Sequence, residues 1–221
     1  EVRLPIPDRI PFLREQLTSL RMLDDFRFAQ KDSPDVLAWA VESVTLAFDL
    51  SLRDLILLMP HLKSIRLQQS GGKLDIYWLF FLLALAWKKP AVFLLWSNLA
   101  SRGRGCPSGD EVDQALEASK LEPRTDHQLD TAMQRDLEGY ETGAVARDYV
   151  RTAFAPHDWL SQELQRKERE HGNKYDLHLD LIHSIINEFK QGSNPLLLYF
   201  DLVKHLGVST LDLGRGGSKA R

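Results

Sequence analysis

The chain has 221 residues, 43% of them hydrophobic and 27% charged, a composition typical of a globular protein with a sizeable core. Its 28 basic and 31 acidic side chains leave a formal charge of −3, which gives no overall field to attract nucleic acid. The single cysteine, Cys106, excludes an internal disulfide framework and indicates a reducing, cytoplasmic compartment.

The start of the sequence shows neither a secretory leader nor an initiator methionine. Residues 1–5 lack the basic and apolar regions of a leader. The missing methionine indicates a start inside a longer chain, or equally processing or a removed tag. The most membrane-like stretch, 76–87, contains no charged residue but has only about 12 residues, short of the ~20 that cross a bilayer. It therefore predicts a buried core helix and no transmembrane segment.

Three helices are expected in the first third of the chain. Asp8 is a plausible N-cap of the first, and Ser33-Pro34-Asp35 is a typical start for the second. Ser51 to Asp54 form a capping box that begins the third, in which Pro60 predicts a kink, and Gly71-Gly72 ends it. The expected buried faces are Ile10, Leu13, Leu17 and Leu20, then Leu37, Val41, Val44 and Phe48, then Leu55, Leu58, Leu62 and Ile65.

The middle of the chain changes from apolar to polar. A shorter helix should follow Pro90, and residues 100–107, rich in glycine and arginine, are the best linker. Ser108 is expected to cap a polar helix over 111–119, within a highly charged region, 110–141, that predicts a lid, an exposed insertion or a partly mobile segment. The aromatic residues before it are expected in the core: Trp78, Phe80, Phe81, Trp87, Phe93 and Trp96.

Four further helices are expected toward the end of the chain. Thr142 can cap the first, and residues 158–171 predict a helix with a solvated, charged face. Residues 177–189 and 196–206 predict two packed helices, with Asn194-Pro195 starting the second.

These elements predict an all-α fold, an irregular multi-helix bundle with a kinked helix near Pro60. We divide it into a helical subdomain over 1–99, a linker and polar segment over 100–125, a second helical subdomain over 126–213 and a disordered tail over 214–221.

No familiar catalytic motif is present, neither a Walker A sequence nor the usual protease, kinase or zinc-site patterns. His178 and His183 are five residues apart on one expected helix, about 140° apart around its axis, which suits separate hydrogen-bonded or solvent-facing histidines better than one metal ion. Cys106 follows two arginines, which could lower its pKa, although an incidental loop cysteine is favoured.

Two short basic clusters are candidates for nucleic-acid contacts. The first combines Lys88-Lys89 with Arg102 and Arg104, and the second combines Arg166-Lys167 with Arg169 among acidic residues. Nothing in the sequence brings either cluster together on one surface. We therefore do not expect nucleic acid as a partner, and no oligomeric state is favoured.

Two stretches resemble the C-terminal helical portion of the KAP family of P-loop NTPases. Residues 2–9, Val-Arg-Leu-Pro-Ile-Pro-Asp-Arg, are similar to the passage from that family's last core strand into its helical lid. Residues 48–55, Phe-Asp-Leu-Ser-Leu-Arg-Asp-Leu, are similar to the start of a lid helix, although Ile56 stands where an acid often follows. The resemblance covers about the first hundred residues and makes 1–99 a lid-like subdomain.

The resemblance implies a regulatory or effector module of a P-loop ATPase, silent in isolation, whose catalytic core precedes Glu1. ATP and Mg²⁺ would then bind only when that core is present, and Arg53 would be the arginine that reaches the γ-phosphate. A surface ion pair of Arg53 with Asp49 or Asp54 is the alternative. A stand-alone protein-interaction domain is the second hypothesis. A third is a small enzyme or nucleic-acid binder, which would require Arg53, His61, His178 and His183 to converge.

Overall fold

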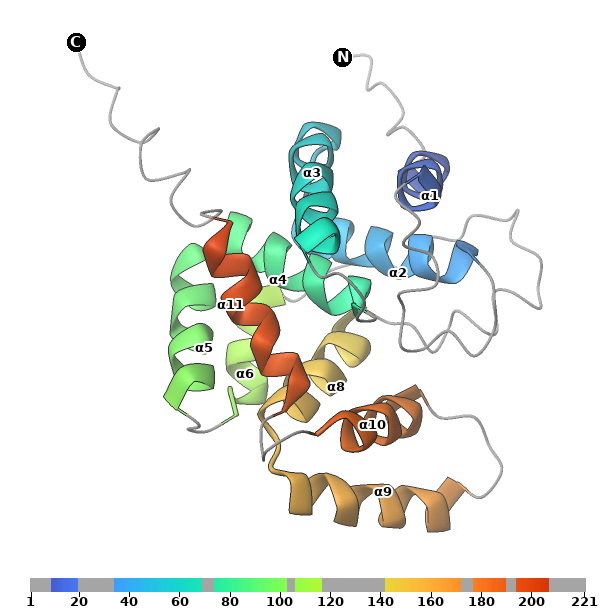
Figure 1. Cartoon of the computed structure of the whole chain (residues 1–221), viewed down its shortest axis with the longest axis vertical. Coiled ribbons are helices and arrows are strands. Elements are labelled where there is room, and N and C mark those ends of the chain that lie inside the picture. Colours follow the sequence, from blue (N-terminus) through green and yellow to red (C-terminus); the bar gives the residue numbers. More distant parts are fainter. Residues whose placement is uncertain are drawn as a thin grey trace.

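The computed structural model describes residues 9–19, 34–68, 74–102, 106–116, 142–171, 177–189 and 194–206, and this part of the chain is all-α, with no strand (Figure 1). The helices are α1 (Arg9–Ser19), α2 (Pro34–Ala47), α3 (Leu52–Gln68), α4 (Ile76–Lys88), α5 (Pro90–Arg102), α6 (Gly109–Leu116), α8 (Thr142–Phe154), α9 (His157–His171), α10 (Leu177–Glu188), the 3₁₀ turn η1 (Pro195–Leu197) and α11 (Leu198–His205).

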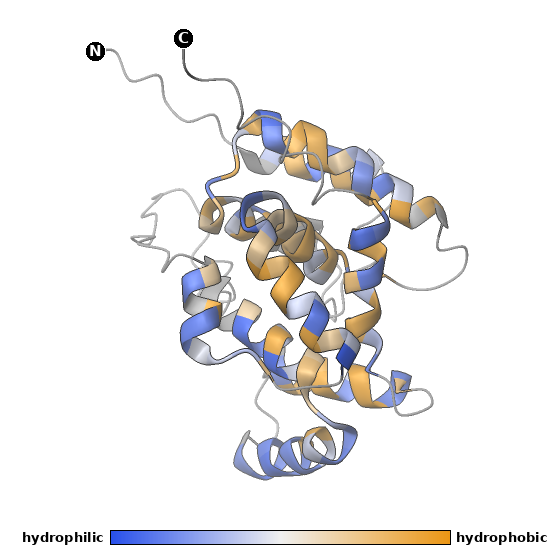
Figure 2. Ribbon diagram, turned by 90° about the vertical axis from the view of Figure 1, so that its left-hand side faces the viewer, coloured by the Kyte–Doolittle hydropathy of each residue, from blue (hydrophilic) through white to orange (hydrophobic). Residues whose placement is uncertain are grey.

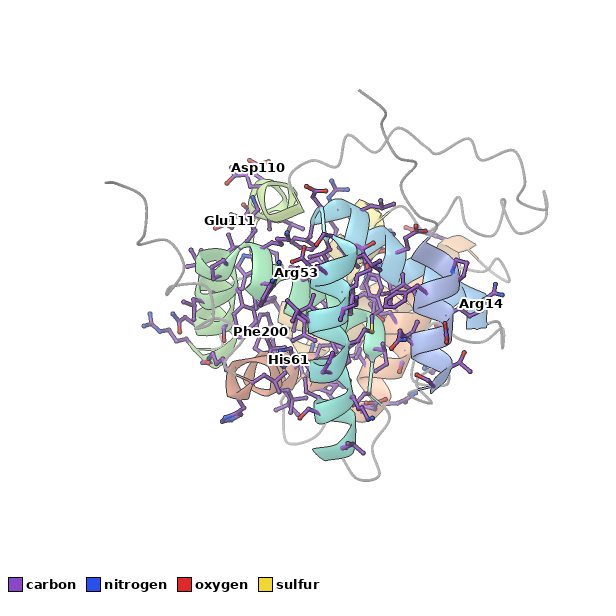
Figure 3. All side chains as sticks on the ribbon, turned by 90° about the horizontal axis from the view of Figure 1, so that it is seen from above. Arg14, Arg53, His61, Asp110, Glu111 and Phe200 are labelled. Carbon is purple, nitrogen blue, oxygen red and sulfur yellow. The ribbon has the colours of Figure 1, made fainter. Side chains whose placement is uncertain are left out.

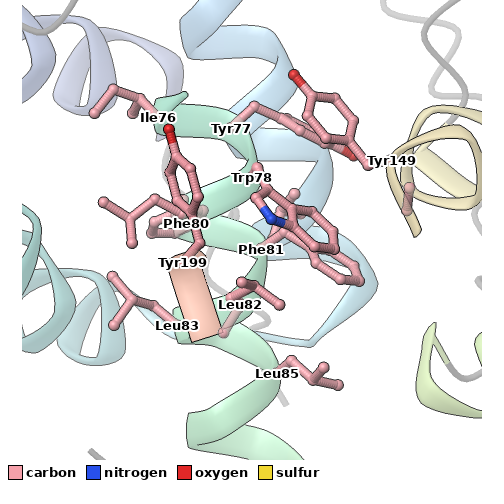
Figure 4. Packing of buried hydrophobic residues seen from close by; sticks show 14 of the residues in the cluster. Ile76, Tyr77, Trp78, Phe80, Phe81, Leu82, Leu83, Leu85, Tyr149 and Tyr199 are labelled. Atoms are coloured by element: carbon pink, nitrogen blue, oxygen red, sulfur yellow. The ribbon is translucent and has the colours of Figure 1, made fainter. Parts of the chain in front are cut away.

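Helix α4 forms the centre of the bundle. Every side chain from Ile76 to Ala86 is buried, and α2, α3, α5 and α11 pack around this helix. Trp78 stacks on Phe81 and on Tyr149 of α8, with ring centroids 5.4 and 5.5 Å apart (Figure 4). The apolar stretch is thus a core helix, as predicted. None of the described helices combines the length and the apolar character needed to cross a membrane.

The remaining helices are added around this centre. α1 packs on α2, while α8 packs against α2, α6 and α10. α9 lies at the far end of the molecule from α3 and contacts α10 (Figure 1). Figure 2 shows α9 as largely hydrophilic, which confirms the solvated face expected for residues 158–171.

Three helix starts form as the sequence predicts. At α3, the backbone N–H of Ser51 donates to Asp54 Oδ2 (2.8 Å) and the N–H of Asp54 donates to Ser51 Oγ (3.2 Å). Ser108 and Glu111 form the same reciprocal pair before α6, at 2.6 and 3.2 Å. Asn194 Oδ1 accepts the N–H of Leu196 and begins η1, so the last predicted helix opens with a 3₁₀ turn. Each side chain satisfies backbone donors that the first helical turn leaves free.

Most of the predicted inner faces are buried. In α1 to α3 these are Leu13, Leu17, Val41, Val44, Phe48, Leu55, Leu58, Leu62 and Ile65. α3 continues through Pro60 as one helix of 17 residues, and the kink expected there stays a prediction. Among the aromatic residues assigned to the core, Trp87 differs from the rest because it is only half-buried.

Some expectations differ from the structure or lie outside the described residues. α5 extends to Arg102, beyond the start of the predicted linker, and α6 begins at Gly109, earlier than the helix expected over 111–119. α6 packs on α8 and buries Val112 and Ala115, so this helix contributes to the core although it is rich in charged residues. Four predicted features lie outside the described residues: the Gly71-Gly72 break, most of the insertion expected over 110–141, the tail over 214–221, and residues 2–8 of the first stretch that resembles the KAP family.

Candidate functional site

The first turn of α3 is held in place by Asp54. Its carboxylate accepts hydrogen bonds from Ser51 Oγ (2.9 Å) and from Trp87 Nε1 (3.0 Å), and it lies 3.1 Å from Lys88 Nζ. Burial alone would raise the pKa of Asp54, but the hydrogen bonds from Ser51, Lys88 and Trp87 outweigh it and the pKa is lowered. Asp54 therefore stays charged and ties the start of α3 to the end of α4.

Arg53 lies in this fixed turn with its side chain exposed (Figure 3). The ion pair with Asp49 or Asp54 considered for it does not form, because Asp54 is engaged by Lys88 and neither carboxylate contacts Arg53. Asp49 sits just before the helix with a positive φ of 47°, where the chain turns from α2 toward α3. The guanidinium of Arg53 is thus presented to solvent on a rigid helix start.

Exposed apolar side chains surround Arg53. Leu52, Ile56 and Leu57 are 37%, 54% and 43% exposed, on the side of α3 that faces away from α4. A guanidinium beside exposed aliphatic groups is typical of a surface that another molecule covers, because arginine is enriched in the energetic centres of interfaces. The start of α3 is the candidate site that the geometry supports best.

A second group of polar residues lies at the start of α4 and is fully enclosed. Asp75 caps the helix: its Oδ1 accepts the N–H of Trp78 (2.9 Å) and its Oδ2 accepts the hydroxyl of Tyr149. The N–H of Asp75 donates to the hydroxyl oxygen of Tyr199 (2.6 Å). Burial, with the charges of Asp75 and Asp148, raises the pKa of neighbouring Tyr77. This cluster joins α4, α8 and α11.

Sequence reasoning missed this cluster, although a signal for Asp75 exists. An aspartate immediately before a long apolar helix is a typical N-cap. Its partners Tyr149 and Tyr199 are 74 and 124 residues away in the chain, and no local pattern connects them to it. Since Asp75 is 0% exposed, we assign the cluster to the fold.

Thr152, His178 and Asp148 are arranged like a hydroxyl–imidazole–carboxylate relay. His178 Nε2 lies 3.2 Å from Thr152 Oγ1, and Nδ1 lies 3.4 Å from Asp148 Oδ1. A nucleophile must meet its substrate, but Thr152 is 0% exposed and its carbonyl is bonded to the Asn194 amide at 2.6 Å. These residues therefore connect α8, α10 and the turn before η1 and do not form a catalytic site.

The residues proposed for a dispersed active site do not converge. Arg53 and His61 belong to α3, whereas His178 and His183 belong to α10, at the other end of the molecule (Figures 1 and 3). His183 is exposed and hydrogen-bonded to Asn187 at 3.1 Å, while His178 is buried. Separate histidines, one hydrogen-bonded in the interior and one facing solvent, are thus what the structure contains. Among the described residues no group of three or more His, Cys, Asp or Glu side chains could hold a metal ion.

The remaining candidates also have ordinary explanations. Burial raises the pKa of the Cys106 thiol more than nearby Arg151 lowers it, the opposite of an activated cysteine. In the second basic cluster Arg166 is paired with Glu163 and Glu170, with contacts of 2.5 to 2.8 Å, and Arg169 donates to the backbone carbonyl of Gln165 within α9. In the first cluster Lys88 is paired with Asp54, and Arg104 lies outside the described residues.

Comparisons of the chain with protein-family models, curated proteins and solved structures found no match. The KAP-like interpretation therefore rests on the two sequence stretches, of which 48–55 falls within the described residues. Its capping box and its exposed arginine are the features that the structure describes there.

Proposed function

We propose that this chain is a regulatory helical module that docks through the start of α3, and that its partner is a P-loop NTPase core of the KAP type. The observation that carries the proposal is Arg53: an exposed guanidinium, free of a carboxylate partner among the described residues, on a helix start fixed by Ser51, Asp54 and Trp87. Arginines that approach a transferred phosphoryl group need such a fixed geometry, because their charge must meet the phosphate in one position.

In this proposal the chain contributes position and charge, and the hydrolytic chemistry belongs to the core. ATP and Mg²⁺ bind to that core, and the first turn of α3 brings the Arg53 guanidinium toward the γ-phosphate. The exposed side chains of Leu52, Ile56 and Leu57 supply the apolar contact that holds the turn against the core.

The test compares the isolated chain with a longer native chain extended upstream of Glu1. We expect no ATP hydrolysis above background from the isolated chain and measurable hydrolysis from the longer one. Because arginines of this kind contribute roughly a thousandfold or more to kcat, Arg53→Ala in the longer chain should lower the rate at least about a hundredfold. Arg169→Ala, an exposed arginine of α9, is the matched control and should leave the rate unchanged. Hydrolysis by the isolated chain, or an unaffected Arg53→Ala variant, would contradict the proposal.

The exposed aliphatic side chains of α3 favour one alternative, a stand-alone protein-interaction domain whose function involves no nucleotide. Leu52, Ile56 and Leu57 would serve the same docking role there. The two functions differ in what the genome encodes just upstream. A Walker A lysine within a few hundred residues favours the first, and a nearby start codon favours the second.

A further inference from the structure

The outer face of α3 has an unusual composition for a surface helix. At about 100° per residue, its exposed residues fall within an arc of about 140°. The opposite arc holds buried Leu55, Leu58, Leu62 and Ile65, so the outer arc would ordinarily be polar. It contains no carboxylate and only two charges, both positive. We define the α3 outer face as Leu52, Arg53, Ile56, Leu57, Pro60, Lys63 and Leu67, all exposed.

The exposed large apolar side chains of the described residues lie on three helices. Of the described side chains, seven large apolar ones are exposed, and they lie on α3, α5 and α11. Leu67 has the largest exposed fraction, 72%. The other helices expose none among their described side chains. Figure 2 views the molecule from the side on which α5 and α11 lie. Outside the α3 outer face these residues are Leu94, Leu95 and Leu198.

Charge is divided in the same way. Helices α3, α5 and α11, with the junction Lys88-Lys89, carry seven lysines and arginines against two aspartates, a formal charge of +5. Helices α6, α8, α9 and α10 carry five basic against ten acidic residues, a formal charge of −5. The two aspartates of the positive part, Asp54 and Asp201, lie 3.1 and 3.8 Å from lysines. Of the two groups of helices, the one that carries the exposed apolar side chains is therefore also the one with the positive formal charge.

We propose that the α3 outer face, extended by Leu94, Leu95 and Leu198, binds a protein surface that combines aliphatic side chains with carboxylates. The inference rests on the proposed function and deepens it, because it states the chemistry of the partner that covers Arg53. Aliphatic groups on both sides remove apolar area from water, and carboxylates opposite Lys63 supply the complementary charge, while Arg53 is left for the phosphate.

A second copy of this chain fits less well. Two such faces together would oppose two positive surfaces, which costs free energy when like charges meet across an interface. The acidic helices α8 to α10 would complement the charge, but their described side chains offer no large exposed apolar group to meet the leucines.

An anionic bilayer also fits less well. Asp49 and Asp201 are exposed beside α3 and on α11, and their carboxylates would be repelled by acidic headgroups. The first turn of α3 is fixed by Trp87 and Lys88, so Arg53 is offered in one orientation. A fixed guanidinium suits an anion held in a defined position by a protein, whereas a fluid lipid layer needs only positive charge.

The test uses a photo-crosslinking amino acid placed at Ile56 of the full chain in its own cells, with the same group at Gln165 on exposed α9 as the control. We expect a crosslink from position 56 to one protein segment with net negative charge, and none above background from position 165. The double variant Arg53→Glu and Lys63→Glu should lower the yield at least about fivefold, because it places like charges together. Replacing the nearest carboxylates of that segment with lysine should restore the yield, and Arg169→Glu should not change it.

Several results would overturn the inference. They are a crosslink to lipid, a crosslink to a second copy of the chain, a yield that the double variant leaves unchanged, or no crosslink above the position 165 control. The outcome also separates this inference from the proposed function. A segment without a P-loop core supports the docking surface and removes the NTPase partner. A P-loop segment with normal hydrolysis in Arg53→Ala supports the surface and removes the role of Arg53 at the phosphate.

Discussion

The starts of α3 and α4 use the same device in opposite surroundings. In each, an aspartate accepts a backbone N–H at the beginning of the helix: Asp54 from Ser51 and Asp75 from Trp78. At α4 the carboxylate is enclosed and its neighbours come from α8 and α11, whereas at α3 the same turn presents Arg53 to solvent. The difference separates polar groups bonded within the protein, which serve its fold, from a fixed charge that faces outward, which we propose meets a partner.

The comparison is tested most strongly at Asp75. Asp75→Ala removes the cap of α4, worth about 1 kcal/mol, and takes the acceptor from the buried Tyr149 hydroxyl, which costs a further ~1–3 kcal/mol. We expect a loss of about 3 kcal/mol in the free energy of unfolding, measured by urea denaturation with circular dichroism. Asp75→Asn keeps one oxygen that can cap the helix, and its amide N–H can donate to the Tyr149 hydroxyl oxygen in place of the acceptor that is lost, so it should lose clearly less. Equal losses in the two variants would show that the side-chain oxygen is not what stabilises this helix start.

The anchor of α3 should have a smaller effect, because it is partly exposed to solvent. Asp54→Ala removes half of the capping box and the contacts to Trp87 and Lys88, and we expect a loss of about 1–2 kcal/mol in urea denaturation at pH 7. Trp87→Phe removes only the indole N–H. Because the indole N–H donates to Asp54, a double-mutant cycle of the two substitutions should give a coupling of about 0.5–1.5 kcal/mol. Additive losses would mean that Trp87 does not hold the turn.

The two helix starts were not equally predictable from sequence. A capping box depends on residues three apart, so Ser51–Asp54 and Ser108–Glu111 could be predicted from the chain alone. The all-α fold and most buried faces followed in the same way, because helical periodicity is a local property. The cluster around Asp75 depends on partners brought together by packing, and one sequence contains no information on which distant tyrosines reach it.

The outer face of α3 shows a second limit of sequence reasoning. The buried residues of α3 were predicted correctly from their spacing. The same leucine-rich run contains Leu52, Ile56, Leu57 and Leu67, and the sequence does not indicate that no other helix covers them. Their exposure depends on where α4 and its companions lie. Arg53 was singled out by a resemblance, and its role stays a prediction. The division into subdomains at residues 99 and 126 also stays a prediction.

Acid should weaken the α3 anchor specifically. The pKa of Asp54 is lowered in the folded chain, so its contribution to stability is fully present above the unfolded value near 3.8 and is lost as the pH falls through the folded value. The stability difference between the native chain and Asp54→Asn should be constant from pH 7 to about 5 and shrink below pH 4. Glu111, whose pKa Ser108 lowers, is present in both proteins and cancels in the difference. A difference that does not vary with pH would contradict a charged Asp54 in the anchor.

The smallest expected change in stability is at Arg53 itself, and it sharpens the comparison further. The side chain is exposed and contacts no carboxylate among the described residues, so Arg53→Ala should alter the free energy of unfolding by no more than about 0.5 kcal/mol. Alanine is also a better helix former than arginine, which offsets any small loss. Urea denaturation of the Arg53→Ala and Asp54→Ala variants measures both losses under the same conditions. The two residues share one helical turn, but the side chain of Arg53 is exposed and that of Asp54 packs against the end of α4. A loss as large as that of Asp54→Ala would mean that Arg53 holds the fold together. A negligible loss, combined with impaired hydrolysis or docking, would place Arg53 among residues kept for a partner.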